Sequence, residues 1–134
     1  MATSNVIYKG QLRTEATHLA SGNKIITDAP VDNHGKGEAF SPTDIVATAL
    51  ASCMFTIIGI KAADSNFDIT NAFATVTKIM SAAPRKICEI VIEFDFRAGT
   101  YSEKEKKLIA NVAKTCPVAL SLHPDIKQTL TFKF

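Results

Sequence analysis

Three cysteines are the residues of this sequence best suited to chemistry. Cys53, Cys88 and Cys116 lie far apart along the chain, which excludes both a C-x-x-C motif and the disulfide framework of a small secreted protein. The first ten residues carry no secretory signal pattern, so we expect a reducing, cytoplasmic setting. A free thiol there is either a small apolar core residue or a nucleophile that reacts as its thiolate.

The surroundings of the three thiols differ. Cys88 shares the apolar parity of an alternating segment with Ile90 and Ile92, which predicts a core position on a strand. Cys53 lies in the middle of an apolar segment with helical signals, where a buried core thiol is the simplest interpretation. Cys116 precedes Pro117, so we expect it near the N-cap of a short helix, where backbone N–H groups would lower its pKa.

Cys53 and Cys116 would form a dithiol if their two helices pack together. Such a pair can reduce a peroxide in two steps: one thiolate attacks the O–O bond and becomes a sulfenic acid, and the second thiol condenses with it to a disulfide. The pair is too far apart in sequence for a local motif, so this hypothesis depends entirely on the fold.

The first third of the chain predicts strands and turns. Residues Val6 to His18 favour a strand, a turn follows at Ser21–Asn23, and the chain returns as a strand over Lys24 to Thr27. A loop over Asp28 to Phe40, with Pro30 and two glycines, then leads to the next element.

The strongest helix signal begins at Ser41, an N-cap residue followed by Pro42 and by Asp44 in the first turn. Residues 45–60 carry no charge and predict a helix buried on all sides. This run is shorter than the about 20 residues that a bilayer span needs, so a membrane protein is the least favoured alternative. Small residues along one stripe favour a helix–helix contact; they are Thr48, Ser52 and Thr56.

The second half of the chain predicts further strands and two helices. Strands are expected over Phe67 to Met80, Ile87 to Arg97 and Ile126 to Phe134. A capping box, Ser102 with Glu105, opens one helix, and a short helix follows Pro117. The order predicts an α+β fold with antiparallel-rich sheets in a single domain, residues 1–134.

Charge and motifs exclude several functions. The 15 Lys and Arg residues nearly balance the 13 Asp and Glu residues, and a net charge of +2 gives no support to a nucleic-acid partner. Phosphate-binding and dinucleotide-binding glycine motifs are absent, and the three histidines lie far apart. We therefore expect no cofactor and no metal.

Three segments resemble the OsmC/Ohr family: Ser41-Pro42-Thr43-Asp44, the run Ala47 to Cys53, and Cys116-Pro117-Val118. The resemblance covers essentially the whole chain. It implies an intertwined homodimer in which a long central helix carrying the first cysteine packs against the sheets. It also implies a thiol peroxidase for organic hydroperoxides, with Cys53 as the peroxidatic and Cys116 as the resolving cysteine. Dithiols such as lipoyl groups on proteins would be the reductant.

The sequence departs from the family's peroxidases at two positions. Thr43 stands where those proteins carry a glutamate, ten residues before the first cysteine. They also carry an arginine in the turn after the first strand, and in the turn at Ser21 the nearby cation is Lys24, which lacks the planar fork of arginine. Glu38, in the loop before the helix, is a candidate for the missing carboxylate.

The leading hypothesis is therefore a dimeric thiol peroxidase for lipophilic hydroperoxides. Phe40, Phe55 and Val118 are the candidates for an apolar lining that receives an alkyl chain. The alternative is a redox sensor or a protein that binds an apolar small molecule without enzyme activity, because a fold alone does not fix a function.

Overall fold

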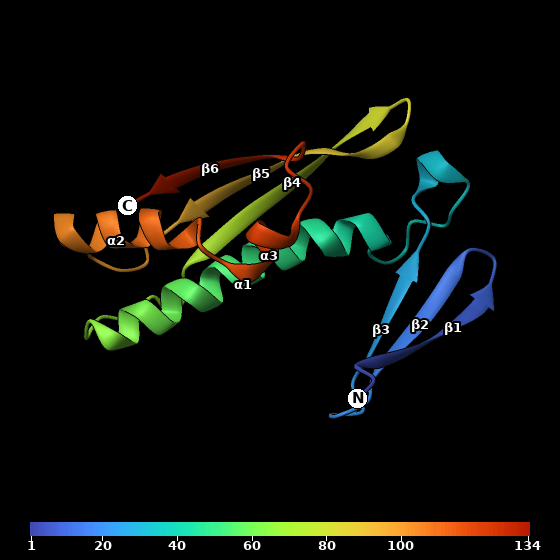
Figure 1. The fold of residues 1–134 in the computed structure, drawn as a ribbon, viewed down its shortest axis with the longest axis horizontal. Coiled ribbons are helices and arrows are strands. Elements are labelled where there is room, and N and C mark those ends of the chain that lie inside the picture. Colours follow the sequence, from blue (N-terminus) through green and yellow to red (C-terminus); the bar gives the residue numbers. More distant parts are fainter. The chain divides into compact units, whose positions relative to one another are not determined.

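Three short antiparallel strands open the chain. The computed structural model describes all 134 residues, in two compact units, Met1–Ile45 and Val46–Phe134. The first unit holds a sheet in the order β1-β2-β3, made of β1 (Ser4–Gly10), β2 (Arg13–His18) and β3 (Lys24–Asp28). A 3-10 turn, η1 (Val31–Asn33), follows in the loop that leads to the first long helix (Figure 1).

The predicted strand from Val6 to His18 is wrong, because the chain reverses inside it. Gly10, Gln11 and Leu12 all have positive φ values, of 88°, 54° and 62°. This left-handed turn folds β2 back onto β1, and the Tyr8 hydroxyl accepts a hydrogen bond from the Leu12 N–H at 3.2 Å. Left-handed geometry is unusual for leucine and glutamine, so the residue types gave little warning of the turn.

Helix α1 (Pro42–Asp64) begins where the sequence predicts. The Ser41 hydroxyl accepts the Asp44 N–H at 3.0 Å, and the Asp44 carboxylate accepts the Ser41 N–H at 2.9 Å. These reciprocal bonds satisfy backbone donors that the first turn would otherwise leave open.

The expectation that α1 is buried on all sides is wrong. One face packs into the core, with Leu50, Met54 and Ile58 at most 1% exposed. The opposite face is exposed along the small-residue stripe of Thr48, Ser52 and Thr56. The helix is long and apolar enough to cross a membrane by length and composition, and the core helix of a soluble protein meets the same criteria.

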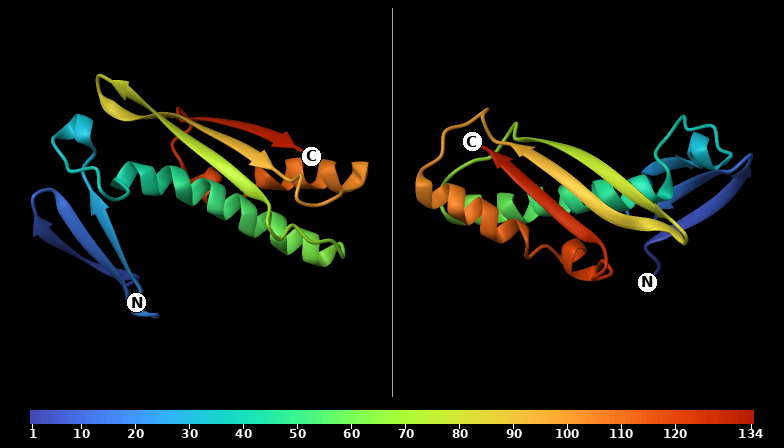
Figure 2. Two further views of the ribbon diagram at one scale, coloured as in Figure 1. Left: turned by 180° about the vertical axis from the view of Figure 1, so that it is seen from behind. Right: turned by 90° about the horizontal axis from the view of Figure 1, so that it is seen from above.

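In the second unit, α1 packs against a mixed three-stranded sheet in the order β4-β5-β6. Strands β4 (Phe73–Ala82) and β5 (Arg85–Asp95) pair as an antiparallel hairpin, and β6 (Lys127–Lys133) lies parallel to β5. The crossover between β5 and β6 contains α2 (Glu103–Ala113) and α3 (Pro117–Ser121), as a parallel connection requires. Helices α1 and α2 lie on the same face of this sheet (Figures 1 and 2).

Two strand predictions need correction. Residues Phe67 to Ala72 lie outside β4, because Asp68 closes a local turn by accepting the Thr70 N–H at 3.0 Å and Asn71 has a φ of 71°. In β5 the register shifts opposite Ile79 and Met80, which moves Ile87 into the core and leaves Cys88 half-buried beside it. The thiol of Cys88 donates to the Ile79 carbonyl at 3.3 Å, so the predicted core position of Cys88 is wrong.

Aromatic rings fill the space between the sheet and α1. Phe94 on β5 is fully buried, stacks on Phe132 of β6 at 5.1 Å and lies perpendicular to the ring of Phe55 of α1 at 5.1 Å. These contacts fix the middle of α1, the turn that carries Cys53, against the sheet. The fold class is α+β, as predicted, with antiparallel pairs in the majority. The single-domain prediction stays a prediction.

Candidate functional site

Cys53 lies in the middle of α1 and is half-buried. It packs against the core cluster between the sheet and the helices, and the neighbouring Met54 is fully buried. Because α1 is held by Phe55 against β5, the Cys53 thiol has a fixed place at the edge of the core. Its partial exposure leaves it open to a small molecule.

Cys116 has the local geometry that the sequence predicts. It is the N-cap of α3, in extended conformation, with Pro117 at the first helical position. The Cys116 sulfur accepts a hydrogen bond from the Ala119 N–H at 3.2 Å, and the residue is fully buried. The Gln128 amide donates to the Ala119 carbonyl at 3.1 Å, which ties α3 to β6.

The two thiols meet in the second unit. Cys53 packs against the buried core cluster that contains Cys116, it raises the pKa of the Cys116 thiol, and both sulfurs are free. Two cysteines far apart in sequence are thus brought together by the packing of α1 and α3 against one sheet. The structure therefore brings a half-buried thiol and a fully buried thiol to one core cluster.

The pKa of Cys116 is shifted in the direction opposite to the one that the sequence predicts. Burial raises the pKa of the Cys116 thiol above its usual value, and this effect outweighs the Ala119 N–H, which lowers the pKa. The neighbouring Cys53 side chain raises the pKa of Cys116 further. The helix cap is present as predicted, but removal of the thiolate from water dominates, so Cys116 holds its proton in the reduced protein.

The predicted lining residues lie in different parts of the chain. Phe55 and Val118 are half-buried apolar residues packed against the same core cluster as the two thiols. The ring of Phe55 points inward, to Phe94 and Phe96. Phe40 belongs to the first unit and is 57% exposed.

An arginine, which the sequence reasoning missed, follows the first strand. Because β1 ends at Gly10, the turn after the first strand runs into Arg13, and the turn at Ser21 joins β2 to β3 instead. Lys24 begins β3 and pairs with Glu15 at 3.1 Å on the surface. Gly10 was the available signal for the earlier turn, since glycine favours positive φ.

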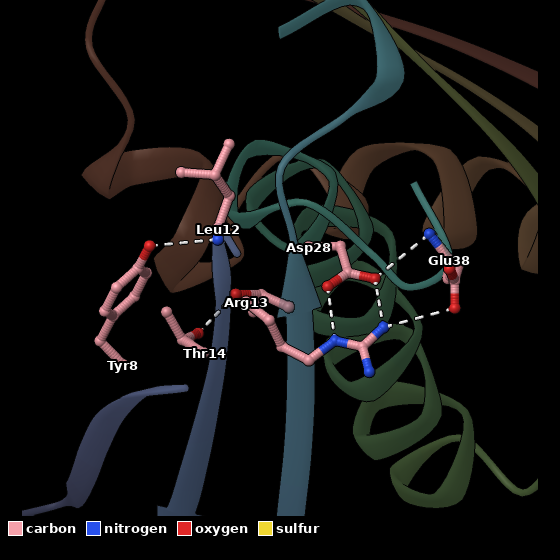
Figure 3. Close-up of polar contacts among 7 residues, drawn as sticks. Tyr8, Leu12, Arg13, Thr14, Asp28 and Glu38 are labelled. Carbon is pink, nitrogen blue, oxygen red and sulfur yellow. Dashed lines mark hydrogen bonds and ion pairs between the residues drawn. The ribbon is translucent and has the colours of Figure 1, made fainter. Parts of the chain in front are cut away.

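Arg13 is held by a buried carboxylate (Figure 3). Its guanidinium binds Asp28 through two parallel hydrogen bonds of 2.7 and 2.8 Å, and the Asp28 side chain is 1% exposed. Asp28 also accepts the Glu38 N–H at 3.2 Å. The hydrogen bond from Arg13 is the main reason that the pKa of Asp28 lies below its usual value, so this carboxylate is ionised.

Glu38 and Thr43 have minor places in this first unit. The Glu38 carboxylate approaches the Arg13 guanidinium at 3.6 Å and is 66% exposed, so Asp28 is the main anionic partner. Thr43 lies in the first turn of α1, where its hydroxyl is 3.2 Å from that of Ser41. No group of three or more His, Cys, Asp or Glu side chains is placed to hold a metal ion.

Comparison with known proteins identifies the family. The family model of OsmC-like proteins matches residues 35–131, which include both thiols of the pair. The comparison with curated proteins finds no match.

Solved structures share the fold over the whole chain. A candidate osmotic-stress-induced and detoxification response protein of Psychrobacter arcticus 273-4 is 57% identical, with a TM-score of 0.95 over 98% of this chain and 96% of that one. An organic hydroperoxide resistance protein OsmC of Legionella pneumophila is 17% identical, with a TM-score of 0.77 over 100% and 98% of the two chains. The organic hydroperoxide resistance protein OhrB of Bacillus subtilis is 18% identical, with a TM-score of 0.64 over 98% of each chain. The motifs around both cysteines, the matched family model and the shared fold agree, and this chain belongs to the family of OsmC-like proteins.

Proposed function

We propose that this protein is a dithiol peroxidase that reduces organic hydroperoxides through Cys53 and Cys116. The observation that supports the proposal is the packing of Cys53, on α1, against the core cluster that contains Cys116, at the N-cap of α3. The OsmC/Ohr family includes organic hydroperoxide resistance proteins, two of which share this fold.

The exposure of the two thiols supports the roles that we propose for them. Cys53 is half-buried and Cys116 is fully buried, so an incoming hydroperoxide meets Cys53 first. The Cys53 thiolate attacks the outer oxygen of the O–O bond, takes up that oxygen as a sulfenic acid and releases the alkoxide, which leaves as the alcohol. Cys116 then attacks the sulfenic sulfur, and the oxygen leaves as water while a disulfide forms.

The surroundings of the thiols favour an apolar substrate. Phe55 and Val118 are apolar and half-buried on the same core cluster as Cys53 and Cys116. An alkyl or aryl chain gains free energy by leaving water for such surroundings, at about 25 cal/mol per Å² of apolar surface. Hydrogen peroxide gains nothing there, so we expect organic hydroperoxides to be the better substrates.

We propose Arg13, rather than Lys24, as the counterpart of the family's arginine. The family's peroxidases carry an arginine in the turn after the first strand, and Arg13 follows that turn in this chain. Its guanidinium is fixed by Asp28 rather than by a glutamate at the position of Thr43. We therefore assign the family's arginine to Arg13 and its carboxylate partner to Asp28, with Glu38 as a secondary contact.

We propose a homodimer as the working form. The three-stranded sheet of the first unit exposes large apolar side chains on both faces, with Val6, Ile7, Ile25 and Ile26 all at least 45% exposed. A three-stranded sheet needs an apolar face that is covered to be stable in water. A second copy of the chain would provide this cover, and the exposed stripe on α1 is a further candidate contact.

The reductant we propose is a dithiol, such as a lipoyl group carried on a protein. A disulfide between Cys53 and Cys116 must be opened by thiolate attack on the more accessible sulfur, and Cys53 is the more exposed of the two. A dithiol completes the reduction within one mixed-disulfide complex, because its second thiol displaces the protein.

The test is steady-state consumption of cumene hydroperoxide with dihydrolipoamide. We expect Cys53→Ser to abolish consumption and Cys116→Ser to allow at most slow turnover, while Cys88→Ser serves as the matched control with wild-type activity. Equal activity of all three variants, or no consumption by the wild type, would contradict the proposal. Thiols that oxidise once and are not recycled by any dithiol would support a redox sensor instead.

A further inference from the structure

We propose that Cys116 has an earlier task than resolution: it donates the proton that the leaving alkoxide needs when Cys53 attacks the hydroperoxide. This inference rests on the proposed peroxidase function and adds a general acid to its first step. Cleavage of the O–O bond releases an alkoxide, which is a far stronger base than a thiolate. A proton delivered during cleavage lowers the barrier and typically raises the rate by a factor of about 10² to 10⁴.

The hydrogen bonds of Cys116 leave its proton aimed at the reacting pair. On one side the sulfur accepts the Ala119 N–H at 3.2 Å. An N–H donor occupies a lone pair of the sulfur, so the thiol's own hydrogen is free for its other neighbour, Cys53, which packs against the same core cluster. Cys116 is fully buried, so bulk water does not reach its thiol in the reduced protein.

Cys116 is also the acid at hand in this unit. The Cys53 side chain and the backbone N–H groups of Ala119 and Val118 act directly on the Cys116 thiol. In the second unit, the Cys116 thiol and a water that enters with the substrate are the two candidate sources of a proton for the alkoxide. The thiol is already in place and needs no entry of water.

The timing follows from the charge on Cys53. In the reduced protein, burial and the neighbouring Cys53 hold the pKa of Cys116 above its usual value. When Cys53 takes up the oxygen it becomes a neutral sulfenic acid, and its negative charge no longer opposes ionisation of Cys116. The N–H groups of Ala119 and Val118 remain and stabilise the thiolate that forms. Cys116 thus becomes more acidic when the alkoxide appears.

The two half-reactions are then coupled and balanced. The Cys53 thiolate and the hydroperoxide give the Cys53 sulfenic acid and an alkoxide, and the alkoxide takes the Cys116 proton to become the alcohol. The Cys116 thiolate displaces hydroxide from the sulfenic sulfur, and a solvent proton converts the hydroxide to water. The hydroperoxide is reduced by two electrons and the two thiols are oxidised to one disulfide. The same proton transfer completes the alcohol and activates the resolving thiol.

The experiment compares two oxidants in single turnover on the full chain. The leaving group of tert-butyl hydroperoxide is an alkoxide, which needs a proton. The leaving group of peroxyacetic acid is acetate, which needs none. Oxidation of Cys53 is followed by quenched-flow mass spectrometry, with dimedone to trap the sulfenic acid. The variant is Cys116→Ala, and Cys88→Ala is the control that keeps both reacting cysteines.

We expect Cys116→Ala to slow the oxidation of Cys53 by tert-butyl hydroperoxide at least tenfold. Its rate with peroxyacetic acid should stay within about twofold of the wild type, which shows that Cys53 and the fold are intact. Equal rates of wild type and variant with tert-butyl hydroperoxide would overturn the inference, and so would an equal fall with both oxidants. Wild-type protein that fails to react with tert-butyl hydroperoxide would instead contradict the proposed function.

Discussion

Phe94 is the side chain whose removal should most directly loosen the helix that carries Cys53. It is fully buried, stacks on Phe132 with ring centroids 5.1 Å apart, and lies perpendicular to the ring of Phe55 at 5.1 Å. Burial of a phenylalanine contributes about 2–3 kcal/mol. Each aromatic pair adds about 0.5–1.5 kcal/mol. We therefore expect Phe94→Ala to lower the free energy of unfolding by about 3–5 kcal/mol, the usual range for this deletion.

Urea unfolding at fixed protein concentration measures this loss. With a slope of about 2 kcal/mol per molar urea, a loss of about 4 kcal/mol moves the midpoint down by about 2 M. The matched control is Phe73→Ala, which deletes the same side chain from β4 of the same sheet at a position that is 63% exposed. Its midpoint should move by less than about 0.5 M. Equal shifts for the two variants would refute the packing described here.

Three further outcomes are expected. A maleimide should label Cys53 and Cys88 in the native protein and Cys116 only after unfolding, because only Cys116 is fully buried; equal labelling of all three, read by peptide mass spectrometry, would contradict this. Because the pKa of Cys116 is raised in the folded state, the unfolded thiol ionises first, so stability should fall as the pH rises above the ordinary value of 9.0. Cys116→Ala should remove this part of the pH dependence in urea titrations at pH 8 and 10. Asp28→Asn removes the carboxylate that binds Arg13 and weakens the hydrogen bond from the Glu38 N–H, so exchange of the Glu38 amide hydrogen should become several-fold faster. Unchanged exchange would argue against Asp28 as the residue that holds this loop.

Local signals explain what the sequence could predict. The start of α1 at Ser41, the capping box of Ser102 with Glu105 and the cap at Cys116 all depend on residues within four positions of one another. Such contacts satisfy backbone donors at a helix end whatever the rest of the chain does. The apolar alternation of β5 likewise reports which face of the strand is buried.

Features that depend on partners distant in sequence could not be predicted. One shift in the register of β5 against β4 moved Cys88 out of the core. Asp28 seemed a plain loop residue because its partner, Arg13, lies on another strand. The pKa of Cys116 depends on complete burial, which no local pattern reports, so the cap was predicted and its electrostatic consequence was not.

The contact between Cys53 and Cys116 can be tested most directly by treating the reduced protein with one equivalent of cumene hydroperoxide and mapping its disulfides by peptide mass spectrometry. The proposed chemistry predicts that one hydroperoxide disappears for each Cys53–Cys116 disulfide formed, within the first turnover and with Cys88 still reduced. Unmodified thiols beside unconsumed hydroperoxide, or a disulfide that contains Cys88 instead, would contradict it.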